Sequence, residues 1–98
     1  MDICEFANKM GRELIILWHP DIKKFSCEFD YSFLLGRKGS RLVRSRGHGA
    51  TVNKAMRNYI QMIRGRFVAF PVCGDNNEDA DVRWQAPKNL RMPKGYKG

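Results

Sequence analysis

The sequence predicts a single α+β domain in which a three-stranded antiparallel sheet packs against helices. Polar and apolar residues alternate with a period of two over 24–31, which is typical of a strand. Apolar residues recur every three or four positions over 52–63, which is typical of an amphipathic helix. A length of 98 residues with 43% hydrophobic residues is enough for one compact core.

A short first helix is predicted over residues 2–10. Asp2 can cap its N-terminus, Glu5 stands at the capping-box position, and Gly11 follows as the C-terminal glycine. The inward-facing residues would be Ile3, Phe6, Ala7 and Met10.

Three strands are expected next, arranged as an antiparallel meander. The apolar run 13–18 predicts a central strand, and the turn residues 19–21 end it. The second strand, 24–31, should place Phe25, Cys27, Phe29 and Tyr31 on one face. The third, 32–46, contains a bulge or hairpin tip around residues 37–38.

The second helix is predicted over about 52–64, with Thr51 as N-cap and Gly65 as the C-terminal glycine. Its spacing defines a buried stripe of Val52, Ala55, Met56, Tyr59, Ile60 and Ile63. A polar face carries Lys54, Arg57, Gln61 and Arg64 at the same spacing.

The C-terminal third predicts a short hairpin and a tail. Residues 67–72 suit an edge or closing strand because Pro71 cannot donate to a ladder, and an exposed edge there could support dimerisation. Residues 82–84 would pair with it. We expect the domain to cover 1–86 and a basic, flexible tail to cover 87–98.

Charge supplies the strongest functional indication. Residues 36–66 hold nine of the eighteen Lys and Arg residues and no Asp or Glu, within a chain of formal net charge +8. Such a segment favours a polyanion, and nucleic acid (RNA or DNA) or a nucleoprotein is the first candidate. An acidic protein surface would satisfy the same arginines. The predicted binding residues are Arg37, Lys38, Arg41, Arg44, Arg46, His48, Lys54, Arg57 and Arg64.

The glycine pair at 47 and 49 has two interpretations. It could open a phosphate-binding helix N-terminus, or it could serve a tight strand-to-helix turn that needs positive φ. On the helix that follows, every charge is positive, and Lys54 stands where a cation opposes the helix dipole, which is a choice that a binding surface can impose.

Other chemistries find little support in the sequence. His19 and His48 have no nucleophile or carboxylate at motif spacing, so we expect no enzyme and no cofactor. The acidic residues of 75–81 lack the EF-hand pattern, and the three cysteines form no metal or disulfide pattern, so we expect no metal and reduced thiols. No segment suits a bilayer, which favours a cytoplasmic protein.

Two family resemblances attach to residues 33–72. Gly47-x-Gly49-x-Thr51 followed by Ala55 resembles the start of the second helix in double-stranded-RNA-binding domains. Where that family carries two lysines, this chain has Val52 and Asn53. The run 47–55, together with Tyr59, Ile63, Gly65 and Val68, is similar to small bacteriophage-encoded proteins with a HicB-like sheet-and-helix arrangement.

The second resemblance implies a phage accessory protein in a bacterial cytoplasm. We therefore expect a non-catalytic protein that binds nucleic acid or a nucleoprotein through its arginines. An anti-CRISPR or other counter-defence inhibitor that binds a host nuclease complex is the alternative, and a HicB-like antitoxin is the second alternative. The sequence leaves the oligomeric state open.

Overall fold

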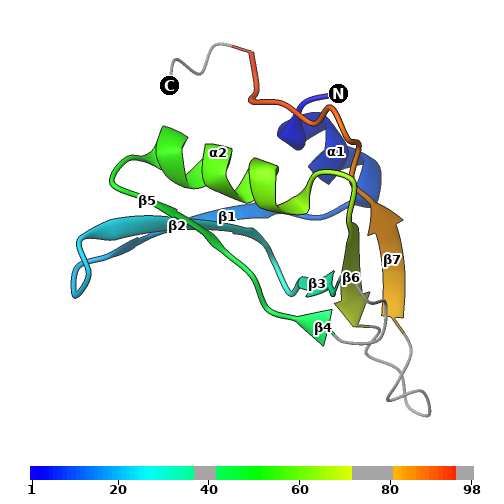
Figure 1. Cartoon of the computed structure of the whole chain (residues 1–98), viewed down its shortest axis with the longest axis horizontal. Helices are drawn as coiled ribbons and strands as arrows, with labels where there is room; N and C mark the ends of the chain where they lie inside the picture. The colour runs from blue at the N-terminus through cyan, green and yellow to red at the C-terminus, as the bar shows by residue number, and fades with distance from the viewer. Residues whose placement is uncertain (37–41, 72–80, 95–98) are drawn as a thin grey trace.

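The chain folds into two antiparallel sheets that share one core with two helices (Figure 1). The computed structural model describes residues 1–36, 42–71 and 81–94. The strand orders are β1-β2-β5 in the first sheet and β4-β3-β6-β7 in the second. The elements are α1 (Ile3–Met10), β1 (Leu14–His19), β2 (Lys24–Phe29), β3 (Phe33–Leu35), β4 (Leu42–Val43), β5 (Gly47–Gly49), α2 (Val52–Ile63), β6 (Phe67–Pro71) and β7 (Asp81–Gln85).

The α+β class is confirmed, and so is the first helix with both of its caps. The Asp2 side chain accepts a hydrogen bond from the Glu5 backbone N–H, and the Glu5 carboxylate accepts one from the Asp2 N–H in return. Gly11 ends the helix in the left-handed region at φ 67°. The four residues predicted to face inward are buried.

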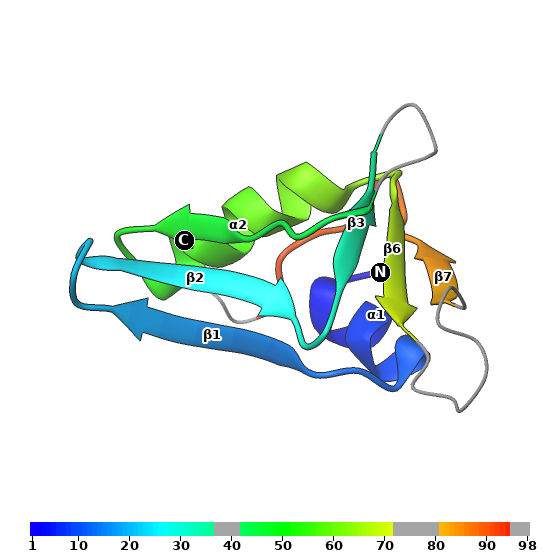
Figure 2. The same cartoon turned by 90° about the horizontal axis from the view of Figure 1, so that it is seen from below.

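The first sheet departs from the predicted meander. β1 lies at its edge and not at its centre, because β5 pairs with the other side of β2. The sequence hid β5, since two of its three residues are glycines and glycine is depleted in strands. Figure 2 shows the face of β1, β2 and β5 that neither α1 nor α2 covers.

Burial along β2 follows the alternation only in part. Cys27 and Phe29 are fully buried as predicted, but Ser26 and Glu28 on the opposite face are buried as well. Tyr31, predicted to share the apolar face, is 79% exposed. It stands beyond the end of the strand in a turn, with φ of 53°, so the alternation no longer determines its direction.

The second sheet joins the predicted 32–46 hairpin to the C-terminal hairpin. β3 pairs with β4 through Leu34 and Val43, and the predicted tip at residues 37–38 lies outside the described residues. β6 pairs with β3 on one side and with β7 on the other, so the expectation of an edge at 67–72 is wrong. Pro71 is tolerated because β3 pairs with β6 only at Val68 and Ala69.

The second helix begins and ends close to the predicted positions, and the Thr51 side chain accepts a hydrogen bond from the Lys54 N–H at 3.1 Å. Gly47 and Gly49 allow β5 to approach this helix. A Cβ at Gly49 would lie 2.5 Å from the Ala55 nitrogen, and one at Gly47 would overlap with the backbones of Ala55 and Tyr59. Positive φ is not the reason for this glycine pair, because the described glycines with positive φ are Gly11 and Gly65.

Residues 87–94 pack on the domain, although the sequence predicted a tail from residue 87. Leu90 is fully buried in the core, and Pro93 is buried too. The Ile3 N–H donates to the Arg91 carbonyl at 3.0 Å. The segment therefore lies against both helices on the side away from the sheets (Figure 1), and the packed part of the chain extends past residue 86.

Candidate nucleic-acid interface

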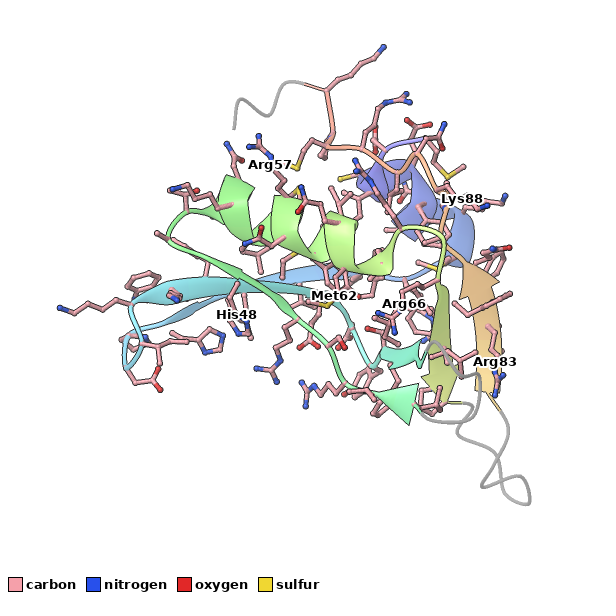
Figure 3. The ribbon with its side chains drawn as sticks, in the orientation of Figure 1. His48, Arg57, Met62, Arg66, Arg83 and Lys88 are labelled. Atoms are coloured by element: carbon pink, nitrogen blue, oxygen red, sulfur yellow. The ribbon has the colours of Figure 1, made fainter. Side chains whose placement is uncertain are left out.

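The predicted binding residues that the structure describes lie on two opposite sides of the first sheet. Figure 3 shows Arg57 on the side of α2 that faces away from the sheet, and His48 on the far side of the sheet. Lys54 and Arg64 belong to the side of Arg57, whereas Arg44 and Arg46 belong to the side of His48. Arg37, Lys38 and Arg41 lie outside the described residues.

The helix side carries exposed cations with no ion pair among the described residues. Lys54 and Arg57 are exposed, and neither lies within ion-pair distance of a described carboxylate. Arg64 at the end of the helix donates from its Nε to the Leu90 carbonyl at 2.7 Å. That hydrogen bond fixes the base of the guanidinium and connects α2 to the C-terminal segment.

The C-terminal segment adds cations that the sequence analysis had assigned to the tail. Its backbone is held by the buried Leu90, and the Lys88 side chain passes Gly65, where a Cβ would lie 3.2 Å from the Lys88 Cγ. We define the outer basic face as Lys54, Arg57, Arg64, Lys88, Arg91 and Lys94. The sequence contains no Asp or Glu at 31–74 or at 82–98, so carboxylates can reach this face only from other segments.

Asp2 is a carboxylate of this kind, and it lies beside Arg91. Its pKa is lowered chiefly by the hydrogen bond from the Glu5 backbone N–H, and Arg91 makes the smallest of the contributions. Asp2 is thus used mainly as the cap of α1. Arg91 is the member of the outer basic face whose charge is partly compensated.

The opposite side, the open sheet face, is the uncovered face of β1, β2 and β5. Here Glu28 is 7% exposed and receives two arginines: Arg44 Nη2 at 3.1 Å and Arg46 Nε at 3.2 Å from its Oε1. Arg46 directly precedes β5. It stands opposite Glu28 of β2, one position beyond the pair formed by Cys27 and Gly47. The Glu28 hydrogen bond raises the pKa of Arg44. These two arginines are therefore engaged within the protein.

His48 neighbours a second histidine on this face. The ring centroids of His19 and His48 are 6.3 Å apart, and His19 Nε2 lies 2.7 Å from Ser26 Oγ. Ser26 is only 1% exposed, so a substrate cannot reach its hydroxyl. The contact between His19 and Ser26 is structural. Sequence spacing did not reveal it, because the antiparallel pairing of β1 and β2 brings positions 19 and 26 together diagonally.

A pocket of 430 Å³ opens where the two sheets meet. Apolar side chains such as Ile15, Leu17 and Phe33 line it together with Arg12, Arg44 and Glu28. The Arg12 guanidinium lies 4.4 Å from the Phe70 ring centroid in a cation–π contact. The cations of this pocket thus already have partners within the fold.

The inner side of α2 is held by a buried hydroxyl. The Tyr59 OH accepts a hydrogen bond from the Phe29 N–H at 3.2 Å, and the Tyr59 ring packs edge-on against the Phe29 ring. Burial raises the pKa of Tyr59 to about 12, and burial likewise raises the pKa of Cys27 to about 12. Both groups are therefore neutral at physiological pH.

Other kinds of site are not found in the described part of the chain. No three His, Cys, Asp or Glu side chains there gather as metal ligands, and Cys4 and Cys27 are free thiols. No helix of residues 1–36, 42–71 or 81–94 is long and apolar enough to cross a membrane.

Comparisons with protein-family models, with curated proteins and with solved structures found no match for this chain. The resemblances to double-stranded-RNA-binding domains and to HicB-like phage proteins therefore stay predictions. The counter-defence and antitoxin hypotheses stay predictions in the same way.

Proposed function

We propose that this protein binds nucleic acid, alone or within a nucleoprotein, through the outer basic face. The observation that carries the proposal is the difference in charge pairing between the two sides. Arg44 and Arg46 are held by Glu28, whereas Lys54 and Arg57 are exposed and have no carboxylate partner among the described residues. Unpaired cations on a fixed surface attract a polyanion, because binding a phosphate releases counterions from the nucleic acid.

The geometry of the helix suits a phosphate backbone. Lys54, Arg57 and Arg64 lie on one side of α2 at spacings of three and seven residues. At a rise of 1.5 Å per residue the ten steps from residue 54 to residue 64 span roughly 15 Å, which is the length of about four base-pair steps of a duplex. Several phosphates can therefore be contacted at once.

The side chains of the outer basic face favour contacts to the backbone over base readout. The exposed aromatic side chains that the structure describes, Trp18, Tyr31 and Phe67, belong to β1, to a turn and to β6. None of them stands on α2 or on residues 88–94, so the described part of the face lacks a platform for stacking bases. We expect binding with low sequence preference and a strong dependence on salt.

The first test is a titration of labelled single- and double-stranded RNA and DNA at several salt concentrations. Wild-type affinity should fall linearly with log salt. The double substitution Lys54→Gln with Arg57→Gln should lower the slope for duplex DNA by roughly 1.8, since about 0.9 is lost for each phosphate contact.

The matched control is Lys23→Gln with Lys24→Gln, which removes the same charge from exposed positions around the β1–β2 turn. Equal losses in the two double variants would mean that only net charge matters. No binding of any nucleic acid at about 50 mM salt, where backbone contacts are strong, would reject the proposal and favour an acidic protein as partner.

A further inference from the structure

No strand of the described residues pairs with the outer edge of β1, and the composition of this free edge is unusual for a sheet edge. The strand Leu-Ile-Ile-Leu-Trp-His contains no Lys, Arg, Asp, Glu or Pro, and Leu17 and Trp18 are each about half exposed. Natural edge strands are commonly protected by charges, proline or bulges, because an unprotected edge pairs with other strands. We propose that a second copy of this chain pairs with β1 in an antiparallel fashion and forms a two-fold symmetric dimer.

The hydrogen-bond pattern determines which backbone groups are available. Leu14 stands opposite Phe29 in the register with β2, and the Asp30 N–H donates to the Glu13 carbonyl at 2.9 Å. In an antiparallel ladder the bonding direction alternates, so the odd-numbered residues of β1 point their backbone groups at β2. The N–H and C=O groups of Leu14, Ile16 and Trp18 therefore point to the free edge.

These three residues select one symmetric register. A two-fold axis perpendicular to the sheet keeps both open faces on the same side, so residues of like parity must stand opposite each other. Placing the axis at Ile16 pairs Ile16 with Ile16 of the second copy and Leu14 with Trp18 of the second copy. All three positions then form bonded pairs, which gives about six hydrogen bonds between the chains.

Side chains match in this register as well. On the open face, Ile15 of one copy stands opposite Leu17 of the other, so the half-exposed Leu17 and the partly buried Ile15 become covered. The next pair places the Glu13 carboxylate opposite His19, an acceptor opposite a group that can donate. No two like charges meet along the strand despite the net charge of +8 of each chain.

The dimer has a geometric consequence for the outer basic face. α2 covers β2 and β5, so the perpendicular axis puts both copies of α2 on the same side of a six-stranded sheet. With strands about 4.8 Å apart, the two helices would be roughly 20 Å from each other. Both outer basic faces then point in one direction. The dimer itself does not depend on the proposed function and is tested without nucleic acid.

The test is sedimentation equilibrium of the wild-type protein over micromolar to submillimolar concentrations. We expect twice the monomer mass, and we expect Leu17→Lys to weaken dimerisation about tenfold or more by placing a charge on the paired edge. The matched control Ile22→Lys changes an equally exposed residue in the β1–β2 turn and should leave dimerisation unchanged. A monomeric wild type, or a dimer that tolerates Leu17→Lys as well as Ile22→Lys, would overturn the proposal.

Cross-linking tests the register. In a Cys4→Ser, Cys27→Ala, Cys73→Ser background, which removes the thiol that stands opposite position 16 within one chain, a short bis-thiol-reactive reagent should cross-link Ile16→Cys between chains, because bonded antiparallel pairs hold their Cα atoms about 5.5 Å apart. Leu14→Cys should not do so, since its copies would stand four positions apart. Equal cross-linking at both positions, or cross-linking at residue 14 alone, contradicts the pairing at Ile16. Circular dichroism confirms that each variant is folded.

Discussion

Two sides of the first sheet both carry basic residues, and they differ in what those residues contact. On the open sheet face, Arg44 and Arg46 converge on the buried Glu28. On the outer basic face, Lys54 and Arg57 have no such partner among the described residues. The comparison teaches that the presence of arginines on a face does not by itself make that face a binding surface. The carboxylates that the fold brings beside them decide which cations are available.

The largest expected effect concerns the contact that holds α2 against β5. Gly47→Ala would push a methyl group into the backbones of Ala55 and Tyr59, which cannot move without shifting the helix. We expect a loss of about 3 kcal/mol in the free energy of unfolding, measured by urea denaturation. His48→Ala at the exposed neighbouring position should cost less than about 1 kcal/mol. Similar losses for the two variants would mean that β5 and α2 are not closely packed.

The next effect concerns the inner side of α2 at alkaline pH. The pKa of Tyr59 is raised from 10.0 to about 12 and that of Cys27 from 9.0 to about 12. A group whose pKa is raised by folding makes its full contribution to stability below its pKa in the unfolded state. This contribution is lost as the pH rises toward its pKa in the folded state. Stability should therefore stay constant up to about pH 8 and fall above pH 9.

Tyr59→Phe isolates one of these two groups. It should be less stable near neutral pH, because the buried Phe29 N–H loses its acceptor. Between pH 10 and 12 the free energy of unfolding should fall less steeply for Tyr59→Phe than for the wild type. The two slopes should differ by about 1.4 kcal/mol per pH unit. Urea denaturation at each pH gives both slopes, and parallel slopes would show that the Tyr59 hydroxyl is not buried in solution.

Glu28→Gln tests the comparison between the two faces directly. The isosteric amide weakens two ion pairs whose arginines are partly exposed, so the loss of stability should be about 1 kcal/mol. The released arginines point away from the outer basic face, so the salt slope of binding there should stay the same, while the open sheet face should gain a second and weaker binding step for nucleic acid. Asp21→Asn removes the same charge from an exposed turn and should add no second step. A second step in both variants would attribute the effect to net charge.

The smallest effect separates stability from binding on the helix itself. Lys54 stands at the third helical position after the Thr51 cap, where Glu would complete a capping box and suit the helix dipole. Lys54→Glu should therefore raise stability by about 0.5 kcal/mol while weakening nucleic-acid binding. Gln61→Glu, near the other end of α2, should not stabilise. A loss of stability in Lys54→Glu would indicate that Lys54 has a structural role.

Local signals predicted the parts of the fold that depend on neighbours in sequence. The Asp2 and Glu5 capping box, the Thr51 cap and the apolar stripe of α2 follow from spacings of three and four residues, and each is present, although Val52 of the stripe is only partly buried. The pairing of β5 with β2 could not be predicted, because it joins segments twenty residues apart and its glycines conceal a strand. The position of β6 inside the second sheet depends on the same kind of long-range pairing.

The candidate site likewise has features that the sequence predicted and features that it did not. Alternation along β2 assigned Glu28 only to the face opposite the apolar side chains, so its pairing with Arg44 and Arg46 could not be anticipated. The basic C-terminal segment was visible in the sequence, but its buried residues Leu90 and Pro93 are too few to give a periodic signal of packing. Lys54 and Arg57 lie on α2 as helical spacing predicted, whereas Arg64 is the C-cap residue just after the helix, and the role of all three in binding stays a prediction.

The central claim is that nucleic acid meets the outer basic face and not the open sheet face. The most direct measurement is a titration of the isotope-labelled protein with a short duplex, followed by amide NMR shifts. The account predicts that the largest shifts fall on α2 and residues 88–94. Shifts concentrated on residues 44–48 and on β1, with α2 unaffected, would contradict it.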